Sequence, residues 1–189
     1  MSETLRRLHS LLRDEDGLIA ELLIEEVPAD ARPAAASPTS SEGAPSPPTP
    51  ASLAAGGPRL DGRAEEYELL IEAIYEGYLL HYRSPRVIRA PEQDLGLLAG
   101  DRLYALGLAR LVALGDIEAV AELADVIALS ALAHGADNPE LAEAVWAAGA
   151  RAVGWGSSAA HERAKALTRA GSPHALASMR SAGEGAQDA

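Results

Sequence analysis

The sequence "LLAGDRLYALGLARLVALGD", residues 97–116, decides the fold class of this chain. It is apolar apart from a Gly100-Asp101 pair, Arg102, Arg110 and the final Asp116, and it predicts one helix running from about 92 to 114. Gly115 is a natural C-terminal stop for that helix, and Asp116 is a natural N-cap for the next one. We therefore expect two long consecutive helices joined by a tight turn.

Similar start and stop signals surround this stretch. Before it, a helix starting near Arg63 places five side chains on one face, namely Tyr67, Leu70, Ile71, Ile74 and Tyr78. After it, one helix ends at Gly135, another begins at Asn138-Pro139, and a fifth begins at Ser157 or Ser158. The short connections predict an all-α fold, an antiparallel bundle of four to five helices.

The composition divides the chain into four parts. Residues 1–26 form an amphipathic helical segment with Leu5, Leu8 and Leu12 on one face. Residues 27–62 hold eight of the twelve prolines and almost no large apolar side chain, which predicts a disordered Pro/Ala/Ser-rich linker. The helical domain covers 63–171, and 172–189 is expected to be a flexible tail.

Charge and cysteine content exclude several classes of function. The chain of 189 residues has 16 basic and 28 acidic residues, and a net charge of −12 repels nucleic acid and anionic lipid. There is no cysteine, and therefore no disulfide and no thiolate ligand or nucleophile. The N-terminus lacks a secretory signal and no apolar run is long enough to cross a bilayer, so we expect a cytoplasmic protein without a transmembrane segment.

Candidate catalytic and metal-binding patterns are weak. The five histidines are scattered, and none belongs to a Glu-x-x-His motif. Three carboxylates share one face of the helix after 116, namely Glu118, Glu122 and Asp125. Because the opposite stripe is apolar and predicted to be the core, with Val120, Leu123, Ile127 and Leu132, we interpret the carboxylates as a solvated row. We expect no catalytic residue, no metal ligand and no cofactor.

Residues 69–116 resemble the central helices of trans-prenyl diphosphate synthases, the all-α isoprenoid synthase family. In that family, "L-x-G-D-x-L-x-A-x-A-x-x-x-L-A-x-x-G-D" follows a helix that ends in "L-I-H-D-D-x-x-D". Here "LLAGDRLYALGLARLVALGD" is similar to the first pattern, and "ELLIEAIYEGYLLHYRSPRVIR" is similar to the helix that precedes it.

The departures from the family pattern decide the expected function. The family's aspartate-rich metal motif is replaced by His81-Tyr82-Arg83-Ser84-Pro85, and its second aspartate-rich motif has no counterpart. Without carboxylates there is no bridging Mg²⁺ to stabilise a diphosphate leaving group. The resemblance therefore implies a catalytically silent relative, or pseudoenzyme.

Two groups of residues remain candidates for weak binding. An arginine row, Arg83, Arg86 and Arg89, is a candidate anion site, and an apolar pocket is predicted from Tyr78, Tyr82 and Leu103. Asp101 is expected to bond to neighbouring backbone or to an arginine such as Arg86 or Arg102.

The leading hypothesis is a non-catalytic helical protein-interaction or scaffold protein that binds a protein partner or forms a homo-oligomer. The alternative is a regulatory or lipid-handling small subunit of a heteromeric prenyl diphosphate synthase, whose partner would be the catalytic subunit. Whether the N-terminal helix packs on its own chain or on a partner is left open by the sequence.

Overall fold

A computed structural model of the chain describes residues 2–15, 17–24 and 48–184, and over these ranges the predicted all-α fold is confirmed. The one β-type pairing among them is an isolated antiparallel bridge between Leu23 and Ile88. The helices are α1 (Glu3–Asp14), α2 (Leu18–Glu21), α3 (Pro50–Ala55), the 3₁₀ helix η1 (Pro58–Leu60), α4 (Ala64–Tyr82), α5 (Gln93–Ala113), α6 (Ile117–Gly135), α7 (Pro139–Trp155), α8 (Ala159–Arg169) and α9 (Ala175–Glu184).

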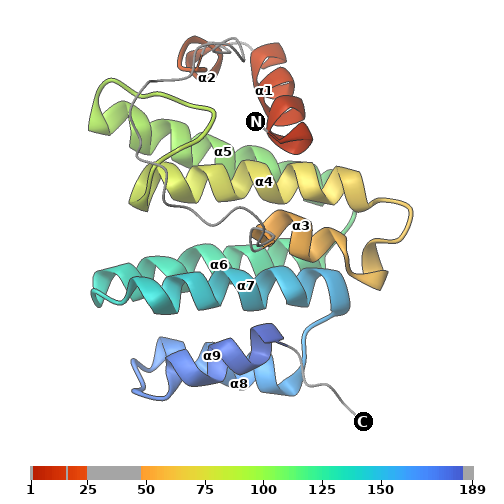
Figure 1. The fold of residues 1–189 in the computed structure, drawn as a ribbon, viewed down its shortest axis with the longest axis vertical. Helices are drawn as coiled ribbons and strands as arrows, with labels where there is room; N and C mark the ends of the chain where they lie inside the picture. The colour runs from red at the N-terminus through yellow and green to blue at the C-terminus, as the bar shows by residue number, and fades with distance from the viewer. Residues whose placement is uncertain (1, 16, 25–47, 185–189) are drawn as a thin grey trace, which may run out of the picture.

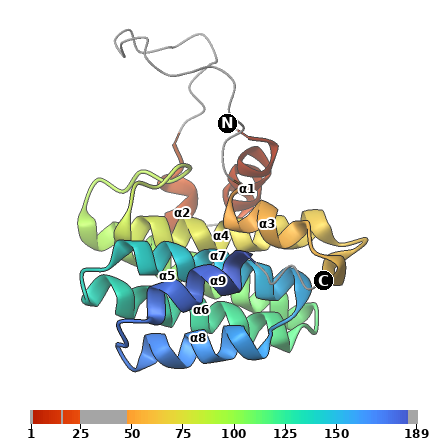
Figure 2. The same cartoon turned by 60° about the horizontal axis from the view of Figure 1, so that its bottom comes forward.

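The antiparallel helices are arranged as a stack of hairpins. The pairs α4–α5, α6–α7 and α8–α9 follow one another along the longest axis of the molecule (Figure 1). Helices α4, α7 and α9 form one layer and α5, α6 and α8 form the other, while α3 packs between α4 and α7 (Figure 2). Stacked helix pairs of this kind bury their apolar faces against neighbouring pairs and leave the outer faces of both layers accessible.

The predicted helix signals account for the hairpin turns. Asp116 Oδ1 accepts a hydrogen bond from the Ala119 N–H at 3.0 Å and caps α6. Asn138 caps α7 in the same way, directly before Pro139 at the first helical position. Ser158, and not Ser157, caps α8. These side chains satisfy N–H groups that have no acceptor inside the helix, which explains where each helix begins.

The core lies between the two layers. All five residues of the predicted α4 face are at most 4 % exposed, and Trp146 of α7 packs edge-on against Tyr75 with ring centroids 4.9 Å apart. A second apolar cluster contains Leu8 and Leu12 of α1 and is continuous with α4 and α5. The N-terminal helix therefore packs on its own chain.

The predicted linker differs from the structure in its second half. Residues 25–47 lie outside the described residues, but 50–60 form α3 and η1. Ala51 and Ala54 are fully buried, and the backbone of Gly57 touches α7 so closely that a Cβ on it would lie 2.2 Å from the Gly154 carbonyl oxygen. A segment poor in large apolar residues can still enter a core where a narrow gap selects small side chains.

The predicted flexible tail is also wrong over residues 175–184, which form α9. Ala175 and Met179 are at most 2 % exposed, and α9 packs against α7 and α8. Helix α9 is only ten residues long, so its stability comes from this packing rather than from local propensity. Residues 185–189 lie outside the described residues.

Among the described helices, none combines the length and the apolar character that crossing a bilayer requires.

Candidate functional site

The arginines predicted as an anion site do not converge. Arg83 Nη2 pairs with Glu143 Oε1 at 2.9 Å, and Arg86 forms ion pairs with Glu72 and Glu76. The Arg89 side chain is exposed, while its backbone N–H donates to the Leu22 carbonyl at 2.8 Å. Carboxylates of this chain thus occupy two of the three guanidinium groups.

Glu76 attaches the segment after α4 to the helix itself. Its side chain is fully buried. Oε1 accepts hydrogen bonds from the backbone N–H groups of Arg86 and Val87, and Oε2 accepts one from Arg86 Nε at 3.1 Å. Glu72, one turn earlier, is also buried; burial raises the pKa of its carboxyl, and Arg86 works in the opposite direction. The sequence contained a signal for this pair, since two acidic residues at i and i+4 lie on a helix that is largely apolar.

The predicted apolar pocket is only partly assembled. Tyr78 and Tyr82 lie side by side with ring centroids 5.6 Å apart, whereas Leu103 is buried in the other cluster, with α1. His134 stacks on Tyr82 at 4.2 Å, and its Nε2 lies 3.0 Å from the Tyr78 hydroxyl. Burial, and secondarily the charge of Arg83, lowers the pKa of His134. Tyr78, Tyr82 and His134 thus contact one another, and Tyr82 is 37 % exposed.

Asp101 contacts a histidine rather than an arginine. Its Oδ1 lies 3.2 Å from Nε2 of His81, whose ring stacks on Tyr104. Arg102 instead pairs with Glu15, at 3.5 Å. The neighbouring Gly100 permits this arrangement, because a Cβ there would lie 2.6 Å from the His81 ring.

The carboxylate row on α6 is not a solvated row. Glu122 is 7 % exposed because α8 packs over it. Its Oε1 lies 2.6 Å from His161 Nε2, and its Oε2 accepts a hydrogen bond from Lys165 Nζ at 3.0 Å. Leu132, predicted to belong to the core face, is 53 % exposed instead. The helix is therefore rotated relative to the predicted apolar stripe.

Lys165 is the centre of this ionic cluster. Its ammonium lies within 3.0 Å of Glu122, Asp125 and Glu162. Burial works against the charged form, but the three carboxylates outweigh it and raise the pKa of Lys165. Hydrogen bonds from Lys165 and Ser157 lower the pKa of Glu162. We call Glu122, Asp125, His161, Glu162, Lys165 and Arg169 the α6–α8 ionic cluster.

The geometry of this cluster is that of a structural ion-pair network. Each carboxylate has a basic partner inside the chain, and Glu118, the third member of the predicted row, lies apart and pairs with Arg59 at 2.8 Å. Among the described residues no group of three or more potential ligands is arranged to hold a metal ion. The sequence pattern does not predict this cluster, because the basic partners of Glu122, namely His161 and Lys165, lie about forty positions further along the chain.

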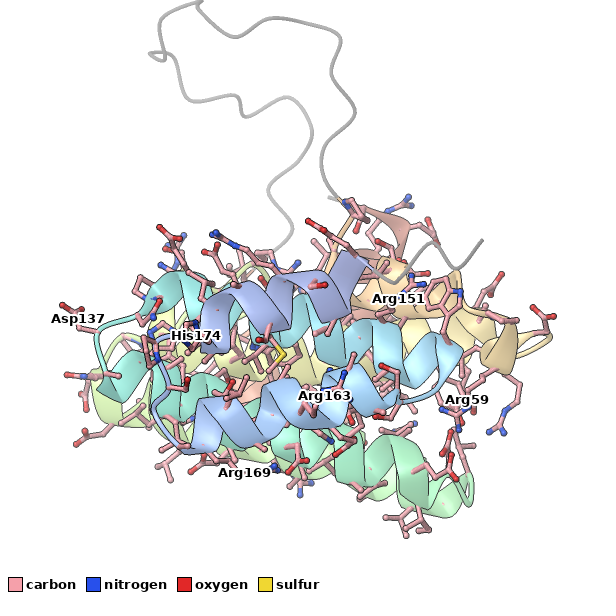
Figure 3. All side chains as sticks on the ribbon, turned by 90° about the horizontal axis from the view of Figure 1, so that it is seen from below. Arg59, Asp137, Arg151, Arg163, Arg169 and His174 are labelled. Atoms are coloured by element: carbon pink, nitrogen blue, oxygen red, sulfur yellow. The ribbon has the colours of Figure 1, made fainter. Side chains whose placement is uncertain are left out.

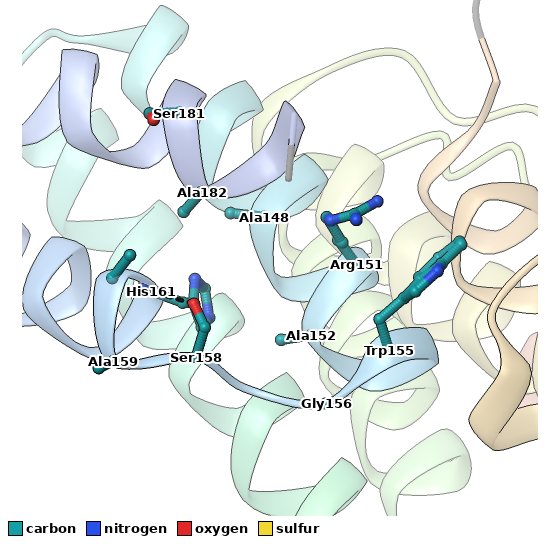
Figure 4. A pocket seen from close by; sticks show the side chains of 11 residues that line it. Ala148, Arg151, Ala152, Trp155, Gly156, Ser158, Ala159, His161, Ser181 and Ala182 are labelled. Carbon is teal, nitrogen blue, oxygen red and sulfur yellow. Dashed lines mark hydrogen bonds between the residues drawn. The ribbon is translucent and has the colours of Figure 1, made fainter. Parts of the chain in front are cut away.

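A cavity of about 450 Å³ adjoins the cluster, between α7, the first turn of α8, and α9 (Figure 4). His161 forms part of its wall, and the Nδ1 atom of this ring is buried without a hydrogen-bond partner. Arg151 lies across the cavity, 4.8 Å above the ring of Trp155. The polar part of the lining is completed by Ser158 and Ser181.

The outer faces of α5 and α6 expose several apolar side chains, alongside charged ones such as Asp101 and Glu118. Four large apolar side chains on these helices are between 52 % and 60 % exposed: Leu98, Val112, Ile117 and Leu132. Exposed alanines lie between them along the two helices, at Ala105, Ala109, Ala121, Ala124 and Ala128. We call these nine residues the α5–α6 surface.

No family model matches the chain, and comparison with curated proteins and with solved structures gives no match either.

Proposed function

We propose that this chain is a non-catalytic helical protein that binds another protein, a partner or a second copy of itself, through the α5–α6 surface. The observation that supports the proposal is the exposure of four large apolar side chains on two neighbouring helices of one layer. Several large apolar side chains exposed on adjacent helices are typical of interaction sites.

The distribution of charge supports the same proposal. The buried carboxylates Glu72, Glu76 and Glu122 are all neutralised by basic side chains of the chain itself. They stabilise the packing of α4 and α6 and present no free acid or base. A net charge of −12 opposes close contact between copies of the chain, while the nine residues of the α5–α6 surface are themselves uncharged.

Light scattering coupled to size-exclusion chromatography tests the proposal. We expect a mass above the 19.6 kDa monomer, or a partner retained from lysate, with the wild-type chain. The double variant Val112→Glu/Leu132→Glu places two charges on the surface and should abolish either contact. The control variant Ala166→Glu/Ala177→Glu adds the same charges at exposed positions of α8 and α9, and the protein contact should remain intact.

The proposal is wrong if the wild-type chain is a monomer that retains no protein. It is equally wrong if the two double variants weaken the contact to the same extent, since the effect would then come from net charge and not from the α5–α6 surface.

A further inference from the structure

We propose that the cavity between α7, α8 and α9 binds a small organic oxyanion, with its carboxylate or phosphate group at the N-terminus of α8 and its apolar body against Trp155. None of the described residues that line the cavity belongs to the α5–α6 surface, so this inference is independent of the proposed protein contact.

The first turn of α8 supplies donors for an anion. The Ser158 hydroxyl accepts the N–H of His161, while the N–H groups of Ala159 and Ala160 have no acceptor among the described residues. Both alanines line the cavity. Helix α8 spans 11 residues, and its N-terminus carries the partial positive charge and free N–H groups that bind carboxylate and phosphate oxygens.

His161 provides an independent indication that a ligand belongs here. The residue is 4 % exposed and lines the cavity, with Nε2 engaged by Glu122. The other ring nitrogen, Nδ1, is buried and has no hydrogen-bond partner. With Nε2–H donating to the Glu122 carboxylate, a ring that carries a proton on both nitrogens presents Nδ1–H as a donor, and an oxyanion in the adjoining cavity would accept that hydrogen bond.

The electrostatics of the cavity favour an anion. The described residues that line the cavity include Arg151 and no carboxylate, although the sequence has 28 acidic residues. The carboxylates of the ionic cluster line a separate cavity together with Lys165. Two carbonyl oxygens at the end of α7 already have hydrogen-bond donors. The Ala152 oxygen accepts from the Gly156 N–H, and the Val153 oxygen accepts from Arg59 Nη1.

The apolar part of the lining selects the body of the ligand. Ala148, Ala152 and Ala182 present only methyl groups, and Trp155 lies at one side with Arg151 above its ring (Figure 4). A flat apolar group can lie against the indole while its charged end reaches α8. The volume of about 450 Å³ is in the range of pockets for small molecules.

Trp155 makes binding measurable by fluorescence, with phenyl phosphate and benzoate as probes. Both should bind more tightly than inorganic phosphate, which lacks the ring, and than benzyl alcohol, which lacks the charge. In Arg151→Met, loss of a charge-assisted contact should weaken phenyl phosphate binding about tenfold. The control Arg163→Met removes the same charge from α8 at an exposed position outside the cavity, and binding should be unchanged (Figure 3).

Two further measurements separate binding in the cavity from a loss of folding. Ala182→Leu should fill the cavity and abolish binding, with the thermal unfolding temperature maintained. In ¹⁵N NMR of the wild-type chain, the Nδ1 resonance of His161 should shift on addition of phenyl phosphate. The proposal fails if neither aromatic probe binds, if Arg151→Met and Arg163→Met behave alike, or if the Nδ1 resonance does not move at saturation.

Discussion

Replacing Lys165 by methionine should destabilise the fold by about 3 kcal/mol, because it leaves a buried carboxylate without its charged partner. Met has a similar length and apolar stem, so the change removes the ammonium and little of the packing. Lys165 pairs with Glu122, Asp125 and Glu162, and these three losses are not equal.

Glu122 accounts for most of the expected loss. It is 7 % exposed and would retain only His161 as a polar contact. Removing one member of a buried pair costs about 3 to 5 kcal/mol, and the remaining histidine contact places the expectation at the lower end. Asp125 retains its ion pair with Arg169, and the Glu162 side chain is 54 % exposed. The loss of each of these two contacts to Lys165 therefore adds less than about 1 kcal/mol to the destabilisation.

Urea unfolding followed by far-UV circular dichroism measures this loss. Arg180→Met is the matched control, since the Arg180–Glu140 pair is exposed and should contribute less than about 1 kcal/mol. The double variant Lys165→Met/Glu122→Leu should be more stable than the sum of the single changes by about 2 kcal/mol, because no unpaired carboxylate remains. Additive losses, or a Lys165→Met loss no larger than that of Arg180→Met, would refute the reasoning.

Acid should weaken the same cluster. The pKa of Glu162 lies below its ordinary value of 4.5 in the folded chain, so its contribution is fully present above that value. It is lost as the pH falls through the lower folded pKa. The stability difference between the wild-type chain and Lys165→Met should therefore shrink below about pH 4, and a constant difference down to the acid transition would contradict this sign.

Three further predictions concern the core. Gly154→Ala should cost more than about 2 kcal/mol in urea unfolding, because its Cβ would lie 2.4 Å from the Ala54 carbonyl oxygen, whereas Gly135→Ala, in open space, should be neutral or stabilising. The pKa of His134 is lowered in the folded chain, so as the pH falls the unfolded chain binds the proton first. The wild-type free energy of unfolding should therefore decrease as the pH falls below 6.5, and the His134→Asn variant should lose this pH dependence. Burial, then the hydrogen bond to Asp116, raises the pKa of Tyr67 to about 12, and Asp116→Asn should lower it in a tyrosinate absorbance titration; an unchanged titration would show that the bond does not contribute.

The sequence signals that the structure confirms act within one helical turn. Asp116 and Asn138 cap helices because their side chains reach N–H groups three residues ahead, whatever the tertiary fold. The apolar face of α4, from Tyr67 to Tyr78, was likewise predictable because a long run at helical spacing has one way to be buried.

The signals that were missed involve partners distant in sequence. Helix α3 enters the core because Gly57 and Gly154, 97 positions apart, let two backbones touch, and neither glycine is distinctive by itself. Helix α9 carries few large apolar residues, and only the groove formed by α7 and α8 gives Met179 a place to be buried.

The local sequence specifies that this chain is helical and where most of its helices begin and end. Tertiary structure decided which polar residues are buried and with which partners. Glu122 has the same local signature as the exposed Glu118 four residues earlier, and only the packing of α8 makes one a buried ion pair and leaves the other at the surface. Local sequence specifies the backbone, but the free energy of a charge depends on what the rest of the chain places around it.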